Sequence, residues 1–251
     1  MISLGDPRTS NPVLSALQIR FSDRIIAVRE NSTADSNFII THLIKQILYE
    51  KNRLCLVSFH NTFEHYQNVG KKLGYDLLKA VQDGDMRIIE PMNDIVDDIG
   101  LEERYFQDDK ENIVKCLYFD IKKNLDEMTE NSGKQAYLIV DDVSHLHDLG
   151  IENSQIVNFV NYLVNLISNE NISVILNNHV ASKYDEIISN NMEYVADVHI
   201  EVSALKTGKS QDVTGLLTVK TRSNKNHFQF KAFDRGIKTF HPGESLHFLY
   251  K

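Results

Sequence analysis

The sequence predicts an α/β fold with a mostly parallel central sheet and a C-terminal antiparallel extension. Two observations support this fold class. Between residues 25 and 176, short unbroken apolar runs alternate with helical periods, as expected when buried parallel strands are joined by crossover helices. After about residue 194 apolar and polar residues alternate one by one, which is typical of antiparallel strands with two different faces.

Each predicted element follows from its own pattern. Apolar runs predict strands at residues 25–28, 54–59, 137–140 and 174–176, with a weaker candidate at 86–89. Apolar residues spaced three and four apart predict helices over 40–48, 114–125 and 156–167. Alternation predicts further strands at 198–202, 217–219 and 228–232. We expect an N-terminal arm over residues 1–20 and a single domain over 21–251.

Composition excludes several classes of protein. The 251 residues are 42% hydrophobic and 25% charged, which excludes a mainly disordered, collagen-like or rod-like chain. No apolar run approaches the roughly 20 residues that cross a bilayer, and the first residues lack a secretion signal. We therefore expect a cytoplasmic protein with no membrane partner, for which a nuclear location is also open. Cys55 and Cys116 are expected to be reduced.

The turn after the first predicted strand is where a phosphate-binding loop would lie. Such a loop needs glycines for close approach to phosphates, a Lys for their charge and a Ser or Thr for magnesium. On the pattern G-x-x-x-x-G-K-[ST], Arg29 and Ala34 replace the glycines, Asp35 replaces the Lys and only Ser36 remains. An acid at the Lys position repels a triphosphate. The sequence therefore predicts no ATPase activity and no cofactor, with Asp35 and Ser36 as helix caps.

Other candidate sites are weaker. Asp141 and Asp142 end a predicted strand, as the magnesium-supporting acid of P-loop enzymes does, but without a phosphate cradle a structural role is favoured. His145 and His147 follow at a generic spacing, so no metal site is predicted. Residues 207–210 end like a P-loop but lack its first glycine, which favours a hairpin turn. No G-x-S-x-G motif occurs, so a hydrolase is not predicted.

Charge is unevenly distributed along the chain. The net charge is −8, yet residues 203–238 carry eight basic residues against two acids. In this region Lys206, Lys209, Arg222 and Lys225 lie in two predicted turns, where they could contact RNA phosphates. A solvated hairpin edge protected by charge is the alternative, and sequence alone favours it.

Two segments of the sequence are distinctive. They are residues 63–74, with the sequence FEHYQNVGKKLG, and residues 137–144, with the sequence YLIVDDVS, followed by Leu149 and Gly150. Both resemble the corresponding segments of the Elongator complex protein 6 family. The similarity in element order extends over roughly residues 21–240. The resemblance implies a RecA-like three-layer sandwich without a P-loop, which agrees with the degraded turn at residues 29–36.

The resemblance also implies a function. It suggests a non-catalytic subunit that alternates with Elongator proteins 4 and 5 in a hexameric ring. That ring binds tRNA and assists the wobble-uridine modification performed by the catalytic Elongator subcomplex. The resemblance does not indicate which residues contact RNA. The alternative reading is a diverged RecA- or recombinase-like scaffold acting in DNA repair.

Overall fold

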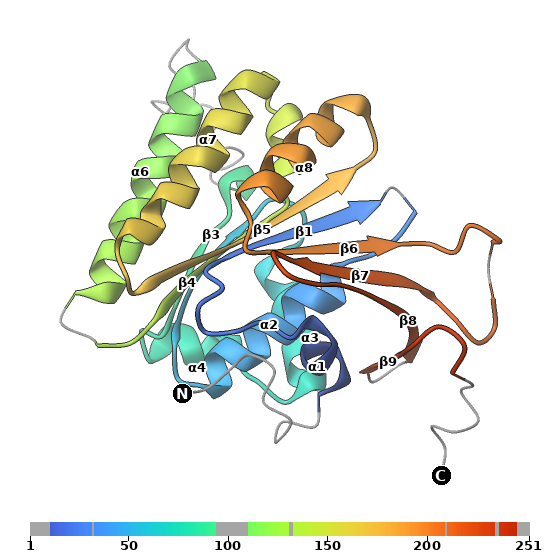
Figure 1. The fold of residues 1–251 in the computed structure, drawn as a ribbon. Coiled ribbons are helices and arrows are strands. Elements are labelled where there is room, and N and C mark those ends of the chain that lie inside the picture. The colour runs from blue at the N-terminus through green and yellow to red at the C-terminus, as the bar shows by residue number, and fades with distance from the viewer. Residues whose placement is uncertain are drawn as a thin grey trace.

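A nine-stranded sheet with helices on both faces forms the described part of the chain (Figure 1). The computed structural model describes residues 11–31, 33–93, 110–130, 133–208, 210–233 and 236–244. The strand order is β3-β2-β4-β5-β1-β6-β7-β8-β9. Neighbouring strands are parallel from β3 to β6 and antiparallel from β6 to β9. The predicted α/β sheet with a C-terminal antiparallel extension is confirmed.

Strands β1 to β8 overlap the predicted segments and extend beyond several of them, whereas β9 has no counterpart among the predicted strands. Their bounds are β1 Ile25–Asn31, β2 Arg53–Ser58, β3 Met86–Ile89, β4 Ala136–Asp141, β5 Ile172–Val180, β6 Val198–Ser203, β7 Gly215–Thr221, β8 Lys225–Phe233 and β9 Gly236–Phe240.

The helices form two layers, one on each face of the sheet (Figure 1). One layer holds α1 Pro12–Leu17, α2 Asn37–Tyr49, α3 Phe63–Leu73 and α4 Leu77–Gln82. The other holds α6 Lys110–Thr129, α7 Asn153–Asn165 and α8 Lys183–Val195, with the 3-10 turns η2 Val143–His147 and η3 Leu166–Ser168 beside them.

The sheet separates two hydrophobic cores, and β1 contributes to both. Ile26 and Val28 pack into the core beneath α1–α4, whereas Ala27 packs into the core beneath α6–α8. Successive side chains of a strand point to opposite faces. The part of a strand that is covered on both faces is therefore apolar at each position, which explains the unbroken run Ile25–Val28 that predicts β1.

Two expectations differ from the structure. Residues 12–17 do not belong to an arm: they form α1, whose Val13, Leu14 and Leu17 are buried. Asn11 caps this helix, because its side chain accepts hydrogen bonds from the Val13 and Leu14 amides. The antiparallel part begins at β7 rather than at β6, because α8 crosses the sheet and returns β6 parallel to β1.

No helix in the described ranges is both long and apolar enough to span a membrane.

Candidate functional site

A pocket of about 880 Å³ opens at the carboxyl-terminal edge of the parallel strands. The chain leaves β1 toward α2 on one face of the sheet but leaves β4 and β5 toward α7 and α8 on the other. The connections that follow these strands therefore diverge to opposite faces and leave a crevice between them. Open α/β sheets bind their ligands in a crevice of this kind. The fold thus places the pocket where a nucleotide would be expected.

The lining of this pocket is acidic and rich in histidine. Its carboxylates are Glu30, Asp35, Asp141, Asp142, Asp148 and Asp185, and its histidines are His60, His65, His145, His147 and His179. No Lys or Arg belongs to the lining among the residues that the structure describes. A triphosphate would meet several negative charges and no fixed positive charge here, which opposes its binding.

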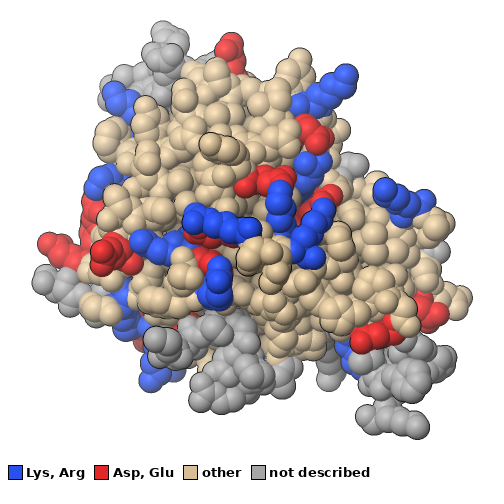
Figure 2. Space-filling view, in the orientation of Figure 1, with Lys and Arg blue, Asp and Glu red and all other residues tan. Residues whose placement is uncertain are grey.

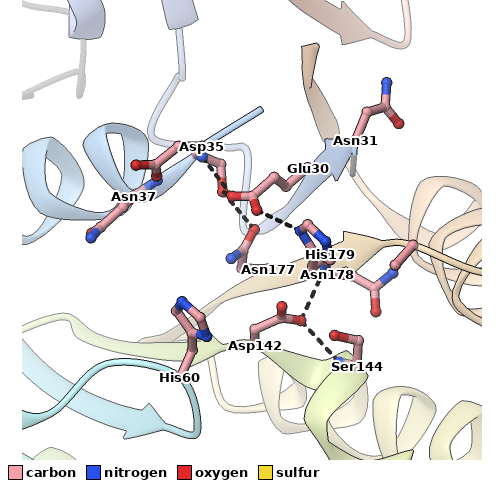
Figure 3. A network of polar contacts seen from close by, with 12 residues as sticks. Glu30, Asn31, Asp35, Asn37, His60, Asp142, Ser144, Asn177, Asn178 and His179 are labelled. Carbon is pink, nitrogen blue, oxygen red and sulfur yellow. Dashed lines mark hydrogen bonds and ion pairs between the residues drawn. The ribbon is translucent and has the colours of Figure 1, made fainter. Parts of the chain in front are cut away.

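Glu30 reaches the N-terminus of α2, the helix that follows β1, and P-loop proteins bind phosphate at a helix N-terminus of this kind. There its carboxylate accepts hydrogen bonds from the Ser36 amide at 2.6 Å and the Ser36 hydroxyl at 2.7 Å. The unpaired amides and dipole of a helix N-terminus attract anions. Here the anion is a side chain of β1 itself, so this helix N-terminus already holds a carboxylate of the chain (Figure 3).

The predicted P-loop residues separate into different roles. Arg29 lies within β1, which extends further than predicted, and its guanidinium contacts Glu186 of α8 at 2.9 Å. Asp35 accepts a hydrogen bond from the Asn37 amide at 2.8 Å, as expected of a cap. Ser36 stands at the N-cap position, but its side chain makes no capping hydrogen bond. Its hydroxyl contacts Glu30 instead, together with Asn177 Oδ1 at 3.1 Å. Ala34 is half-buried against the core.

Asp141 is buried at the end of β4 and is held by donors from three elements. Asn177 Nδ2 of β5 donates to it at 2.6 Å, Asn61 Nδ2 lies at 3.4 Å, and the Tyr66 hydroxyl of α3 also donates to it. Burial and the neighbouring Asp141 raise the pKa of Tyr66 well above its usual value. The Tyr66–Asp141 hydrogen bond joins the two segments that carry the family resemblance.

Asp142, the residue after Asp141, belongs to a second set of polar contacts that leads through His179 to Glu30 (Figure 3). Its Oδ1 accepts hydrogen bonds from the Ser144 amide at 2.9 Å and the His179 amide at 3.0 Å. Burial, with a further contribution from Asp141, raises the pKa of Asp142 to about 6. His179 Nδ1 in turn lies 2.6 Å from Glu30 Oε1. These strand-end acids are therefore bound by the chain's own donors.

The histidines of the pocket do not form a metal centre. His145 Nδ1 lies 2.7 Å from Asp148 Oδ2, and its Nε2 lies 3.1 Å from His60 Nδ1. His147 Nδ1 lies 3.1 Å from the Ile151 carbonyl oxygen. Within the described ranges no group of three or more His, Cys, Asp or Glu side chains could hold a metal ion.

Sequence reasoning missed Glu30, Asn177 and His179. The signal for the last two is their place, because they directly follow the apolar run of β5 and so reach the carboxyl edge beside Asp141. Glu30 carried no comparable signal. Its role depends on how α2 turns back toward β1.

The predicted RNA-binding residues are not brought together. Lys206 lies between β6 and β7, at the carboxyl-terminal edge of the parallel strands, whereas Arg222 and Lys225 flank the turn between β7 and β8 at the opposite edge. The seven residues of β7 separate the two turns, or roughly 23 Å at the usual rise. Arg222 also contacts Asp197 at 2.7 Å. Lys209 lies outside the described residues.

These features define a class of protein: a RecA-like α/β domain in which a carboxylate of β1 is bound at the N-terminus of α2. A KaiC-like protein from the hyperthermophilic archaeon Pyrococcus horikoshii shares this fold, with a TM-score of 0.62, 15% identity and coverage of 95% of this chain and 99% of that one. The family model for Elongation complex protein 6 matches residues 10–237, and the chain belongs to this family.

Curated relatives agree with this assignment at low identity. Elongator complex protein 6 of Drosophila melanogaster is 24% identical, over 87% of this chain and 90% of the relative. The Homo sapiens protein of the same name is 23% identical, over 86% of this chain and 89% of the relative. The family predicted from the two segments is confirmed.

Proposed function

We propose that this chain is a non-catalytic subunit of a hexameric Elongator accessory ring, in which it alternates with Elongator proteins 4 and 5. The ring supports tRNA binding and the wobble-uridine modification performed by the catalytic Elongator subcomplex. Membership of the Elongator complex protein 6 family supports this placement. The ring acts in the cytoplasm, and a nuclear location is compatible with this function.

The Glu30 carboxylate at the N-terminus of α2 is the observation that supports the absence of catalysis. Nucleotide hydrolysis by a RecA-like domain needs a phosphate cradle and a cation beside it. Glu30 uses the Ser36 amide and hydroxyl that would otherwise face a phosphate. No Lys or Arg of the described lining compensates for the acids around it.

Exposed apolar side chains support assembly with other subunits. Phe119 of α6 and Tyr162 of α7 are each more than half exposed, and they border a groove of about 490 Å³ between these helices. Aromatic residues are enriched at protein–protein interfaces, so these two side chains and the groove beside them fit a contact with another subunit.

A nucleotide assay tests the catalytic part of the proposal. The purified chain, alone and with Elongator proteins 4 and 5, is titrated with a fluorescent ATP analogue and assayed for phosphate release. We expect the chain alone to show no binding and only background hydrolysis. Turnover by the chain alone that Asp141→Ala abolishes would show that the strand-end acids support catalysis, and it would contradict the proposal.

Co-purification tests the partners. A tagged chain is expected to retain Elongator proteins 4 and 5. Retention of recombination proteins in their place would favour a recombinase-like scaffold.

A further inference from the structure

A second surface lies at the amino-terminal edge of the parallel strands, opposite the pocket. The residues that start β1, end α8 and form the β7–β8 turn meet there around Asp197. The Asp197 carboxylate accepts hydrogen bonds from the Arg24 amide at 3.0 Å and the Ile25 amide at 3.1 Å, and Arg222 Nη2 lies 2.7 Å away. One carboxylate therefore fixes the positions of three segments that are distant in sequence.

Several cations lie on this surface, and three of them are paired with acids. Arg20 contacts Asp23 at 3.0 Å, Lys220 contacts Glu193 at 2.6 Å and Arg222 contacts Asp197 at 2.7 Å. The Arg24 guanidinium donates to the Ile172 and Asn169 carbonyl oxygens, and Lys225 stands opposite Lys220 in the β7–β8 register. On the face shown in Figure 2, Lys and Arg gather across the middle of the molecule with Asp and Glu among them. Arg222 contacts Asp197 through one nitrogen, yet its side chain is 80% exposed. The remaining guanidinium N–H groups are therefore open to an anionic ligand.

Two exposed aromatic rings accompany these cations. Tyr194, in the last turn of α8, is 89% exposed, and Phe21, next to Arg20, is 66% exposed. Tyr194 lines a hollow of about 450 Å³ together with Glu193, Lys220 and Arg222. Neither ring packs into a hydrophobic core. Their solvent-facing planes can take a second planar group, and the cations beside them can take phosphates.

We propose that Arg20, Phe21, Tyr194, Lys220, Arg222 and Lys225, here called the amino-edge surface, bind single-stranded RNA. Unpaired bases stack on Tyr194 and Phe21 while the cations contact the backbone. Paired bases are excluded, because an aromatic ring can reach a base face only where the base is unstacked. The choice of RNA rests on the proposed function. The RNA contact then lies at the amino-terminal edge of the parallel strands, and Lys206 is not part of it.

The test compares aromatic variants on the amino-edge surface with a control variant at the other end of α8. The assembled ring with Elongator proteins 4 and 5, and the full chain alone, are titrated with tRNA and with a fluorescent single-stranded RNA of roughly ten nucleotides, a length within the range that one such surface covers. Tyr194→Ala and Phe21→Ala are each expected to weaken binding by about fivefold or more. Tyr194→Phe keeps the ring and is expected to bind like the wild type. Tyr184→Ala, on the 66% exposed Tyr184 at the other end of α8, is the matched control.

Salt dependence tests the cations in the same samples. Arg222→Ala is expected to reduce the slope of log affinity against log salt by about one unit, whereas Lys206→Ala leaves it unchanged. Circular dichroism checks that each variant is folded, which the exposure of these side chains leads us to expect.

The outcomes separate this inference from the proposed function. If the wild-type ring binds tRNA and the Tyr194, Phe21 and Arg222 variants bind equally well, the amino-edge surface is not the RNA site, but the proposed function stands. If the same variants disrupt ring assembly and leave RNA affinity intact, the surface docks a protein subunit and the inference is wrong. A wild-type ring that binds neither tRNA nor the short RNA contradicts the proposed function itself.

Discussion

Replacing Glu30 tests whether its carboxylate acts as an internal substitute for phosphate. Glu30→Ala removes the acceptor for the Ser36 amide and hydroxyl and the partner of His179 Nδ1. A buried hydrogen-bond donor that loses its acceptor lowers the free energy of unfolding by about 1–3 kcal/mol. Ser36 Oγ keeps its contact with Asn177, so its loss is partly offset. We expect a total loss of about 3 kcal/mol in the free energy of unfolding.

Urea denaturation followed by circular dichroism measures this loss. For a chain of this length, about 3 kcal/mol corresponds to a fall in Tm of roughly 6–12 °C. Glu186→Ala is the matched control, because it removes a carboxylate that contacts the neighbouring Arg29 near the surface and should cost less than about 1 kcal/mol. A loss for Glu30→Ala no larger than that of the control would refute the role given to this carboxylate.

Three further predictions concern buried groups. Burial raises the folded-state pKa of Asp142 from 3.8 to about 6. Protonated Asp142 therefore stabilises the fold below about pH 4, and this contribution is lost as the pH rises to about 6. Asp142→Asn should therefore flatten the decline in urea-measured stability over this window, and an unchanged decline would contradict the pKa. Tyr66→Phe removes a donor to Asp141 and should cost about 1–3 kcal/mol on urea denaturation; a neutral result would mean that the other donors suffice. Burial raises the pKa of the Cys55 thiol to about 12, so mass spectrometry should find it alkylated by iodoacetamide only after unfolding, and rapid labelling of the native chain would refute its burial.

The sequence predicts the parallel sheet well because β1, β2, β4 and β5 each contain an unbroken apolar run. Leu138 and Ile139 of β4 pack into the cores on opposite faces of the sheet, so neither position is open to a solvent-exposed polar side chain. Helix α8 was not predicted, because its buried face includes polar side chains such as Asp185 and Ser189. Its exposed face carries apolar ones such as Ile187. Such a helix lacks the clean apolar stripe on which periodicity depends.

The candidate site was predictable only in part. The missing Lys and glycines are visible in the linear motif, because that motif requires particular residue types at fixed spacing. The contact of Glu30 with the N-terminus of α2 depends on how β1 and α2 meet, which spacing does not encode. Lys206 and Arg222 were grouped by composition. Because they lie before and after β7, they fall at opposite ends of a strand, and only strand direction reveals this.

Native mass measurement of the endogenous complex tests the proposed place of the chain most directly. The chain is tagged, purified under native conditions and weighed together with whatever it retains. We expect a hexamer that contains this chain with Elongator proteins 4 and 5. A stable monomer that stays monomeric when mixed with Elongator proteins 4 and 5 would contradict the proposal.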